Sequence, residues 1–278
     1  MTAPEQYKGA LEVNVLQQVM AYQRTLEESL GLSRPRRGIV IAGPCIIEED
    51  LTVLEKAAET VSKLGIPILR GGSFKNRTSY RSFQGLEEDG LKYHVQICRH
   101  FGLKSVSEIM DGSQVDLFRD IDILQIGEKN MKNYILMREV AKMGKPVVLK
   151  RNVNSSIGEV LHATEKFLQY GQERIVLCER GINASSHEMV YRNVLDLNAV
   201  AWLKASLKIP VIVDPSHSAG IRSLVAPLAK AAIAVGCDGL MVEAHCDPES
   251  ATCDREQALS NEDLIALDAA VNLQLGGS

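Results

Sequence analysis

Eight short runs rich in valine, isoleucine and leucine recur along the chain, and they constrain the fold more than any other feature. The runs are Ile39–Ala42, Ile66–Leu69, Lys104–Val106, Ile123–Ile126, Pro146–Leu149, Ile175–Cys178, Pro210–Val213 and Gly239–Val242. Short apolar runs of this kind are typical of buried strands, and longer amphipathic segments separate them. Eight such strand-and-helix units predict an α/β fold, the (β/α)8 TIM barrel.

The segments between the runs carry the helical pattern. We expect helices at Leu51–Leu64, Asn130–Lys142, Ser156–Tyr170, Asn198–Ser206 and Ile221–Val235. In the first of these, Leu54, Val61 and Leu64 fall on one face, and glycine and proline follow the segment. An open, doubly wound sheet is the alternative fold. It is disfavoured because no Gly-rich dinucleotide-binding fingerprint follows the first apolar run.

The part of the chain before the first run predicts a short N-terminal helical extension. Apolar residues recur at helical spacing over residues 11–32, and the sequence SRPRRG at 33–38 ends this pattern. We therefore expect an extension and linker at residues 1–37 and the barrel at residues 38–278. The extension either closes the bottom of the barrel or packs on another subunit.

Composition and charge limit the class of function. The chain has 278 residues, of which 45% are hydrophobic and 24% charged, as in soluble globular proteins. Its net charge of -4 gives no overall positive field for nucleic acid. No segment approaches the ~20 apolar residues of a membrane span, and the N-terminus does not resemble a signal peptide. We expect a cytoplasmic protein whose six cysteines are mostly free thiols.

Charged and reactive residues follow nearly every apolar run, whereas the starts of the runs lack them. The ends read Gly43-Pro44-Cys45, Arg70 through Lys75, Ser107-Glu108, Gly127-Glu128-Lys129, Lys150-Arg151, Glu179-Arg180, Asp214-Pro215-Ser216-His217 and Glu243-Ala244-His245. Active sites of (β/α)8 barrels lie at the C-terminal ends of the strands. This polarity predicts a functional site at one mouth of the barrel.

Cations dominate several of these ends. The stretch Arg70–Gly85 carries four cations and no acid, and Gly71 and Gly72 let its backbone approach a ligand closely. It predicts a phosphate-binding loop, with a solvated basic loop as the alternative. The full cationic set is Arg70, Lys75, Arg77, Lys129, Lys150 and Arg180. Gathered at one mouth, these cations would repel each other unless several anionic groups bind, for instance two phosphates and a carboxylate.

A second set of end residues suggests a metal. It comprises Cys45, His217, Glu243 and, further along, Asp254. The first, seventh and eighth strands become neighbours when a barrel closes, and one thiolate, one imidazole and two carboxylates can bind a divalent ion. The spacing alone is weak, because there is no C-x2-C or H-E-x2-H signature and a buried Cys or His is often only part of the core.

Taken together, these stretches resemble a known family. GPCIIEE, RGGSFKNRTSYRSFQG, LQIGEKNMKN, VVLKR, LCERG, LDLNAV, VIVDPSHSAG and GLMVEAHCDPE are similar, in the same order, to segments of 3-deoxy-D-arabino-heptulosonate 7-phosphate (DAHP) synthases of the single-barrel beta type. The similarity runs from about Ile39 to Leu259. It implies a (β/α)8 enzyme that condenses phosphoenolpyruvate with erythrose 4-phosphate and water, releasing phosphate, at the first step of the aromatic pathway.

The resemblance also implies roles for individual residues. Cys45, His217, Glu243 and Asp254 would bind one divalent ion (Mn, Fe, Co or Zn). Arg70, Lys75, Lys150 and Arg180 would bind phosphoenolpyruvate, with Lys129 where the family has Arg, and Arg77 and Thr78 would bind the phosphate of the aldose. Lys75 is the candidate proton donor, and His217 is either a ligand or a proton relay. A homodimer or homotetramer is expected.

Three departures from the family pattern leave the substrate open. Asn76 replaces the usual Pro of the aldose loop, Glu128-Lys129 replaces Ala-Arg, and Ile46 replaces a Ser. Asn76 and Ile46 are closer to the related 3-deoxy-D-manno-octulosonate 8-phosphate synthases, so condensation with arabinose 5-phosphate or another aldose phosphate is the first alternative. A non-catalytic phosphate-binding barrel and a different barrel enzyme, such as a metal aldolase, are the others.

Overall fold

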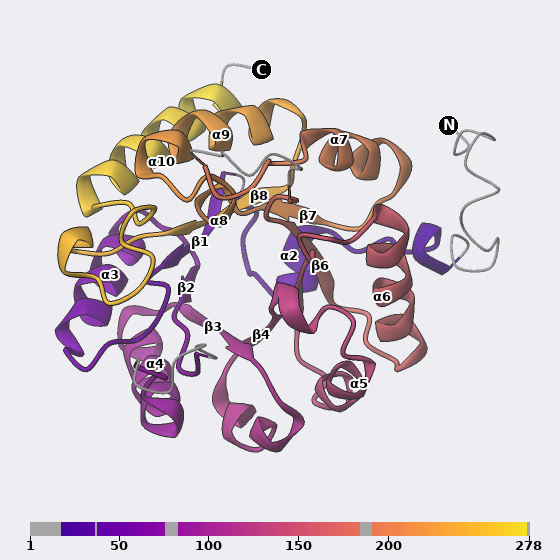
Figure 1. Cartoon of the computed structure of the whole chain (residues 1–278), viewed down its shortest axis with the longest axis horizontal. Helices are drawn as coiled ribbons and strands as arrows, with labels where there is room; N and C mark the ends of the chain where they lie inside the picture. Colours follow the sequence, from indigo (N-terminus) through magenta and orange to yellow (C-terminus); the bar gives the residue numbers. More distant parts are fainter. Residues whose placement is uncertain (1–17, 37, 76–82, 184–190, 277–278) are drawn as a thin grey trace.

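The apolar runs form eight parallel strands in the computed structural model, which describes residues 18–36, 38–75, 83–183 and 191–276 (Figure 1). The strands are β1 (Ile39–Gly43), β2 (Ile68–Arg70), β3 (Lys104–Ile109), β4 (Ile123–Ile126), β5 (Val147–Lys150), β6 (Ile175–Glu179), β7 (Val211–Val213) and β8 (Gly239–Glu243). Each strand pairs with the next in sequence, and β8 pairs with β1. The predicted closed barrel is confirmed, and the open sheet was the wrong alternative.

Helices surround the barrel (Figure 1). They are α3 (Thr52–Lys63), α4 (Glu87–Phe101), α5 (Tyr134–Lys142), α6 (Ile157–Gln169), α7 (Leu197–Ser206), α9 (Arg222–Ala234) and α10 (Asn261–Gly276). The five segments predicted to be helical correspond to α3, α5, α6, α7 and α9. Between β3 and β4 the chain forms two 3-10 helices, η2 (Gly112–Gln114) and η3 (Leu117–Asp120), in place of an α-helix.

The helices α4 and α10 were not among the predicted ones. In α10 the apolar residues lie on more than one face: Leu267 and Val271 are buried, while Ile265 and Leu273 are exposed. A helix of this kind lacks the one-sided pattern from which amphipathic helices are recognised.

Two apolar clusters form the core. The larger lies between the strands and the surrounding helices and includes Phe118 and Phe167. The smaller takes residues from every strand, among them Val40, Ile123 and Met241, and none from α3 to α10. Because side chains alternate between the two faces of a strand, this second cluster is the interior of the barrel.

The N-terminal segment differs from the single helix predicted over residues 11–32. Residues 18–20 are helical and residues 21–25 are not, and α2 (Leu26–Leu30) then begins anew. The break follows from a capping box: the Thr25 hydroxyl accepts from Glu28 N, and the Glu28 carboxylate accepts from Thr25 N at 2.8 Å. These two residues favour a helix start at Leu26 over a continuous helix.

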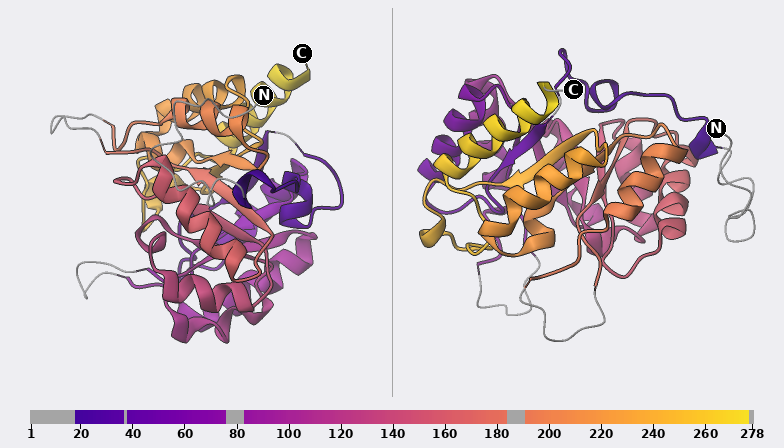
Figure 2. Two further views of the ribbon diagram at one scale, coloured as in Figure 1. Left: turned by 90° about the vertical axis from the view of Figure 1, so that its right-hand side faces the viewer. Right: turned by 90° about the horizontal axis from the view of Figure 1, so that it is seen from above.

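Helix α2 closes the bottom of the barrel, as one of the two alternatives predicted. Leu26 and Leu30 are buried and belong to the interior cluster. Tyr22 anchors the segment by donating a hydrogen bond from its hydroxyl to Ile175 O at 3.0 Å. Figure 2 shows α2 lying at one end of the barrel, across the starts of the strands.

Two further observations bear on the sequence predictions. All six cysteines are free thiols, as expected. Within the described ranges, no helix combines the length and the apolar character needed to cross a bilayer. The division into residues 1–37 and 38–278 stays a prediction, because residues 1–17 and 37 lie outside the described part of the chain.

Candidate active site

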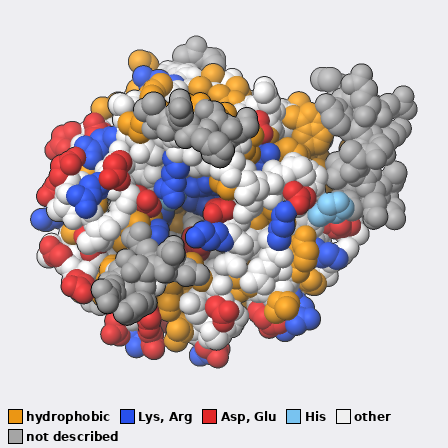
Figure 3. Space-filling view, in the orientation of Figure 1, with side chains coloured by type: hydrophobic (Ala, Val, Ile, Leu, Met, Phe, Trp, Pro, Cys, Tyr) orange, Lys and Arg blue, Asp and Glu red, His pale blue; other side chains and the backbone are white. Residues whose placement is uncertain are grey.

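The C-terminal ends of the strands surround a small cavity at the mouth of the barrel. Its lining includes Cys45, Arg70, Lys75, Glu108, Lys150 and His217, contributed by residues at or just after β1, β2, β3, β5 and β7. In the space-filling view, Lys and Arg side chains gather near the centre of the molecule (Figure 3). The polarity of the strand ends, read from the sequence, thus corresponds to a real concentration of charge.

Four side chains at this mouth, all of types that bind metal ions, lie close together. One ligand atom from each of Cys45, His217, Glu243 and Asp254 lies within 4.8 Å of all the others. Cys45 Sγ is 3.0 Å from Asp254 Oδ2, and His217 Nε2 is 3.1 Å from Glu243 Oε1. Glu243 Oε1 is buried and has no hydrogen-bond partner among the described residues.

This donor set fits a divalent transition-metal ion. A buried carboxylate is costly unless cations lie beside it, and Glu243 Oε1 has ion-pair contacts with His217 and Arg70 in place of hydrogen bonds. One sulfur, one imidazole nitrogen and two carboxylates are ligands that Mn²⁺, Fe²⁺, Co²⁺ and Zn²⁺ accept. The four residues could therefore hold such an ion.

The sequence Asp214-Pro215-Ser216-His217 positions the imidazole. Asp214 caps the short helix α8 (Pro215–Ala219) by accepting from His217 N at 3.0 Å, and proline occupies the first helical turn, where it is favoured. The other oxygen of Asp214 lies 2.7 Å from His217 Nδ1. Because Nδ1 is engaged there, Nε2 points to the cluster, as in many metal-binding histidines.

Charges around His217 set its protonation. Burial alone would lower the pKa of His217, but Asp214 and Glu243 raise it to about 9. Burial would likewise raise the pKa of Asp214, yet His217 and Lys150 hold it well below its ordinary value. Lys150 Nζ lies 2.6 Å from Asp214 Oδ2. The buried carboxylate of Asp214 therefore contacts both His217 and Lys150, one of the cations predicted to bind substrate.

Glu243, at the end of β8, is fully buried and faces two positive groups. Arg70 Nη2 is 3.2 Å from Glu243 Oε1. Burial would raise the pKa of Glu243, but His217 and Arg70 bring it far below the usual range. The carboxylate is therefore ionised, as a metal ligand must be, whereas His217 would have to release the proton that its neighbours favour when an ion binds.

Lys75 lies between the metal-type cluster and the cavity. Its Nζ is 3.0 Å from Cys45 Sγ and 3.7 Å from Asp254 Oδ2. Burial would lower the pKa of Lys75, but Cys45, Cys253 and Asp254 raise it above its ordinary value. The side chain is thus a protonated ammonium group that can donate a hydrogen bond or a proton into the cavity.

The remaining predicted binding residues divide into three groups. Arg70 and Lys150 line the cavity, and Arg180 Nη2 donates to His217 O at 3.3 Å beside it. Lys129, in the 3-10 helix η4 (Glu128–Asn130), is exposed and is not among the residues that line the cavity. Arg77 and Thr78 lie outside the described residues.

Sequence reasoning gave no role to several residues that the structure places at the mouth. Glu108 lines the cavity and accepts a hydrogen bond from Gln125 at 2.9 Å. A Cβ at Gly127 would lie 1.9 Å from Glu108 Oε1, so glycine there makes room for the carboxylate. Cys253 Sγ lies 3.6 Å from Cys45 Sγ. Only Glu108 carried a signal, as a charged residue near the end of its strand.

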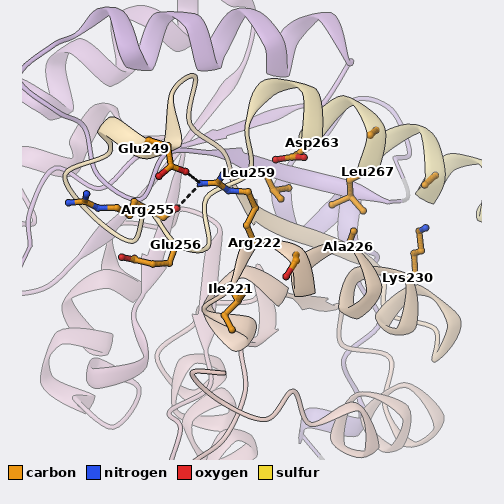
Figure 4. Close-up of a pocket in the computed structure, with 13 residues that line it drawn as sticks. Ile221, Arg222, Ala226, Lys230, Glu249, Arg255, Glu256, Leu259, Asp263 and Leu267 are labelled. Atoms are coloured by element: carbon orange, nitrogen blue, oxygen red, sulfur yellow. Dashed lines mark hydrogen bonds and ion pairs between the residues drawn. The ribbon is translucent and has the colours of Figure 1, made fainter. Parts of the chain in front are cut away.

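A larger hollow lies outside the barrel, between α9 and α10 (Figure 4). Its lining includes Arg222, Leu259 and Leu267 and contains neither cysteine nor histidine. Arg222 donates to Ala258 O at 2.6 Å and to Arg255 O at 3.1 Å. The hollow is therefore next to the segment that carries Asp254, and Arg222 holds the backbone of that segment in place.

The sequence matches one protein-family model and the sequences of two kinds of aldolase. A model of the DAHP synthetase I family matches residues 27–274. A phospho-2-dehydro-3-deoxyheptonate aldolase of Thermotoga maritima is 42% identical over 224 residues, which cover 80% of this chain and 65% of that protein. A 2-dehydro-3-deoxyphosphooctonate aldolase of Alkalilimnicola ehrlichii is 31% identical over 247 residues, covering 82% of this chain and 87% of that protein.

Solved structures agree with the sequence matches. The crystal structure of the DAHP synthase of Thermotoga maritima superposes with a TM-score of 0.83 at 38% identity, covering 87% of this chain and 70% of that one. A truncated form of the enzyme from the same organism gives a TM-score of 0.79 at 36% identity, covering 87% of each chain. The chain spans 65% of the length of the first sequence relative, so the two proteins share the barrel and not their full extent.

Proposed function

This chain belongs to the DAHP synthetase I family, and we propose that it condenses phosphoenolpyruvate with erythrose 4-phosphate and water to give DAHP and inorganic phosphate. One observation carries the proposal: four metal-type ligands, a protonated Lys75 and two further buried cations meet at one mouth of the barrel. A simple phosphate-binding barrel would need the cations but neither the ligand cluster nor Lys75. We also expect a cytoplasmic homodimer or homotetramer.

The cations would orient phosphoenolpyruvate. Arg70 and Lys150 are only 6% and 4% exposed, so an anion between them is shielded from water and strongly attracted. Arg180, held beside His217, would add a third positive charge. With its phosphate and carboxylate bound in this way, the substrate would lie in the cavity that Cys45 and Lys75 also line.

The bond changes follow from this placement. The methylene carbon attacks the aldehyde carbon of the sugar, and the carbonyl oxygen takes a proton from Lys75 and becomes a hydroxyl. Water then adds to the neighbouring carbon of the former enol, and one of its protons replaces the proton that Lys75 gave up. The bond from this carbon to the phosphate oxygen breaks, the carbon becomes the ketone of the product, and phosphate leaves with the second proton of the water. A divalent ion held by Cys45, His217, Glu243 and Asp254 would supply Lewis-acid polarisation of the aldehyde.

The second part of the proposal is the identity of the aldose phosphate that reacts with phosphoenolpyruvate. The higher identity to a heptonate aldolase than to an octonate aldolase, 42% against 31%, favours erythrose 4-phosphate. Asn76 favours a broader choice, because Asn lacks the fixed φ of Pro and offers a donor and an acceptor to sugar hydroxyls. Its position lies outside the described residues, so this argument rests on the sequence.

The test is a panel of aldose phosphates. We expect phosphoenolpyruvate consumption with erythrose 4-phosphate at the highest kcat/KM, weaker turnover of arabinose 5-phosphate, and one phosphate released per condensation. Asn76→Pro should shift the preference further toward the four-carbon sugar, by ~1–2 kcal/mol at most, the value of one hydrogen bond. Preference for the five-carbon sugar would assign the octulosonate activity instead. Condensation without phosphate release would indicate a metal aldolase, and no turnover of any sugar would indicate a binding protein.

A further inference from the structure

The carboxylates of Asp254 and Glu243 each use their two oxygens for different partners. Asp254 turns Oδ2 to Cys45, at 3.0 Å, while its Oδ1 lies 3.3 Å from Arg192 Nη1. Glu243 turns Oε1 to His217, at 3.1 Å, while its Oε2 accepts a hydrogen bond from Gln257 Nε2. Each carboxylate therefore presents one oxygen to the cluster and has the other held from outside.

Arg192 and Gln257 are also hydrogen-bonded to each other. Arg192 Nη1 donates to Gln257 Oε1 at 3.2 Å. Because this amide oxygen accepts from Arg192, the amide nitrogen must face Glu243, and the orientation of the side chain is determined. Gln257 is only 2% exposed, so water cannot easily replace either bond. One hydrogen-bonded chain thus joins Asp254 to Glu243 without passing through the cluster.

The same segment also contacts the helix that carries the imidazole. Arg192 N donates to Ala219 O at 3.0 Å, and Asn193 Nδ2 donates to His217 O at 3.0 Å. Asp254 itself has a left-handed backbone conformation, with φ at 55°, which Asp tolerates better than most residues other than glycine.

We propose that Arg192 and Gln257 are positioning residues that keep both carboxylates monodentate, so that a bound divalent ion retains open coordination positions for substrate. A catalytic metal site needs such positions, whereas a carboxylate that swings to bind through both oxygens fills one more of them. By occupying Asp254 Oδ1 and Glu243 Oε2, the pair prevents this change. The inference deepens the proposed function and rests on its metal site.

The experiment measures Co²⁺ binding by the full chain, independently of turnover. Arg192→Gln shortens the side chain and removes the guanidinium group, and Gln257→Met removes the amide while keeping the side-chain size. We expect the Co²⁺ affinity to fall about 10- to 100-fold, the usual effect of losing an outer-shell partner. The visible Co²⁺ bands should weaken, because they lose intensity as the coordination number rises. Arg192→Lys, which keeps the charge but not the fork, should recover part of the affinity.

A neighbouring arginine supplies the control. Arg255 is exposed and follows Asp254 in the sequence, and Figure 4 shows it at the hollow between α9 and α10, so Arg255→Gln should leave the affinity and the spectrum unchanged. Wild-type affinity and an unchanged spectrum in both Arg192→Gln and Gln257→Met would overturn the inference and leave the proposed function intact. Failure of the wild-type protein itself to bind Co²⁺ through a thiolate would overturn the metal site of the proposed function, and the inference with it.

Discussion

The two ends of the barrel are formed by the same eight strands but have opposite chemistry. At the bottom, Leu26 and Leu30 of α2 complete an apolar cluster that fills the interior. At the mouth, Arg70, Asp214 and Glu243 are at most 6% exposed and ionised. Burying apolar groups stabilises a fold, whereas burying charges costs free energy even when they are paired. The residues that stabilise the fold by apolar burial and the charged residues available for catalysis therefore lie at opposite ends of the barrel.

The first prediction concerns the mouth and has the largest expected effect. Lys75→Met removes the ammonium group 3.0 Å from Cys45 Sγ and keeps most of the volume. We expect kcat to fall by about 10²- to 10⁴-fold, the range for loss of a general acid. The thermal midpoint should change little, because an apolar side chain is cheaper to bury than a charge and Asp254 keeps a second ionic partner, Arg192. Lys230→Met, at an exposed position, is the control for both measurements. A drop in the thermal midpoint that accompanies the loss of kcat would mean that Lys75 supports the fold.

The second prediction concerns the bottom. Leu30 is fully buried, so Leu30→Ala leaves a cavity next to the interior cluster. The free energy of unfolding, measured in urea, should fall by about 2–5 kcal/mol. The kcat of the remaining folded protein should be unchanged. Leu273→Ala, at a side chain that is 79% exposed, should change stability by less than about 0.5 kcal/mol. Lost turnover at unchanged stability would contradict the separation of the two ends.

The third prediction concerns His94, a buried histidine that lacks the charged neighbours of His217. Charged neighbours raise the pKa of His217 to about 9, whereas burial lowers the pKa of His94, in α4, to about 4. An unfolded histidine titrates near about 6.5. Between about pH 4 and pH 6.5, this histidine binds a proton in the unfolded chain but not in the folded chain. The free energy of unfolding should therefore fall as the pH drops through this window, by about 3 kcal/mol at most.

Urea unfolding between about pH 4.5 and 7 measures this effect. In His94→Gln the side chain no longer titrates, and Gln can still donate to Leu69 O, the present partner of His94 Nε2 at 3.1 Å. The variant should lose less stability on acidification than the wild type does. Equal slopes in the two proteins would mean that His94 does not contribute to the acid sensitivity.

Much of the architecture could be predicted because it depends on local pattern. Apolar runs identified all eight strands within a few residues, and the charged or reactive residues after nearly every run identified the mouth. The cluster of Cys45, His217, Glu243 and Asp254 was also within reach, since closing the barrel brings β1, β7 and β8 together. The strands and the mouth follow from periodicity and topology, whereas the assignment of the four residues as one ligand set came from the resemblance to the family.

Other features depend on side-chain geometry that no pattern encodes. Lys129 follows the end of β4, as other site cations follow their strands, but the 3-10 helix η4 leaves it exposed. Arg192 and Gln257 come from separate connections after β6 and β8, and only the folded chain shows that they hold Asp254 and Glu243. The break at Thr25 follows from a capping box between Thr25 and Glu28, which the apolar spacing over residues 11–32 does not reveal.

The most direct test of the account is the metal dependence of phosphate release. Wild-type protein is exhaustively chelated, analysed for residual metal, and assayed with phosphoenolpyruvate and erythrose 4-phosphate before and after addition of Mn²⁺, Co²⁺ or Zn²⁺. We expect activity to fall to background on chelation and to return with metal. Cys45→Ser should need more metal for the same activity, because a hydroxyl is a poorer ligand than a thiolate. Full activity in the metal-free protein would contradict the central claim that the cluster at the mouth acts through a bound ion.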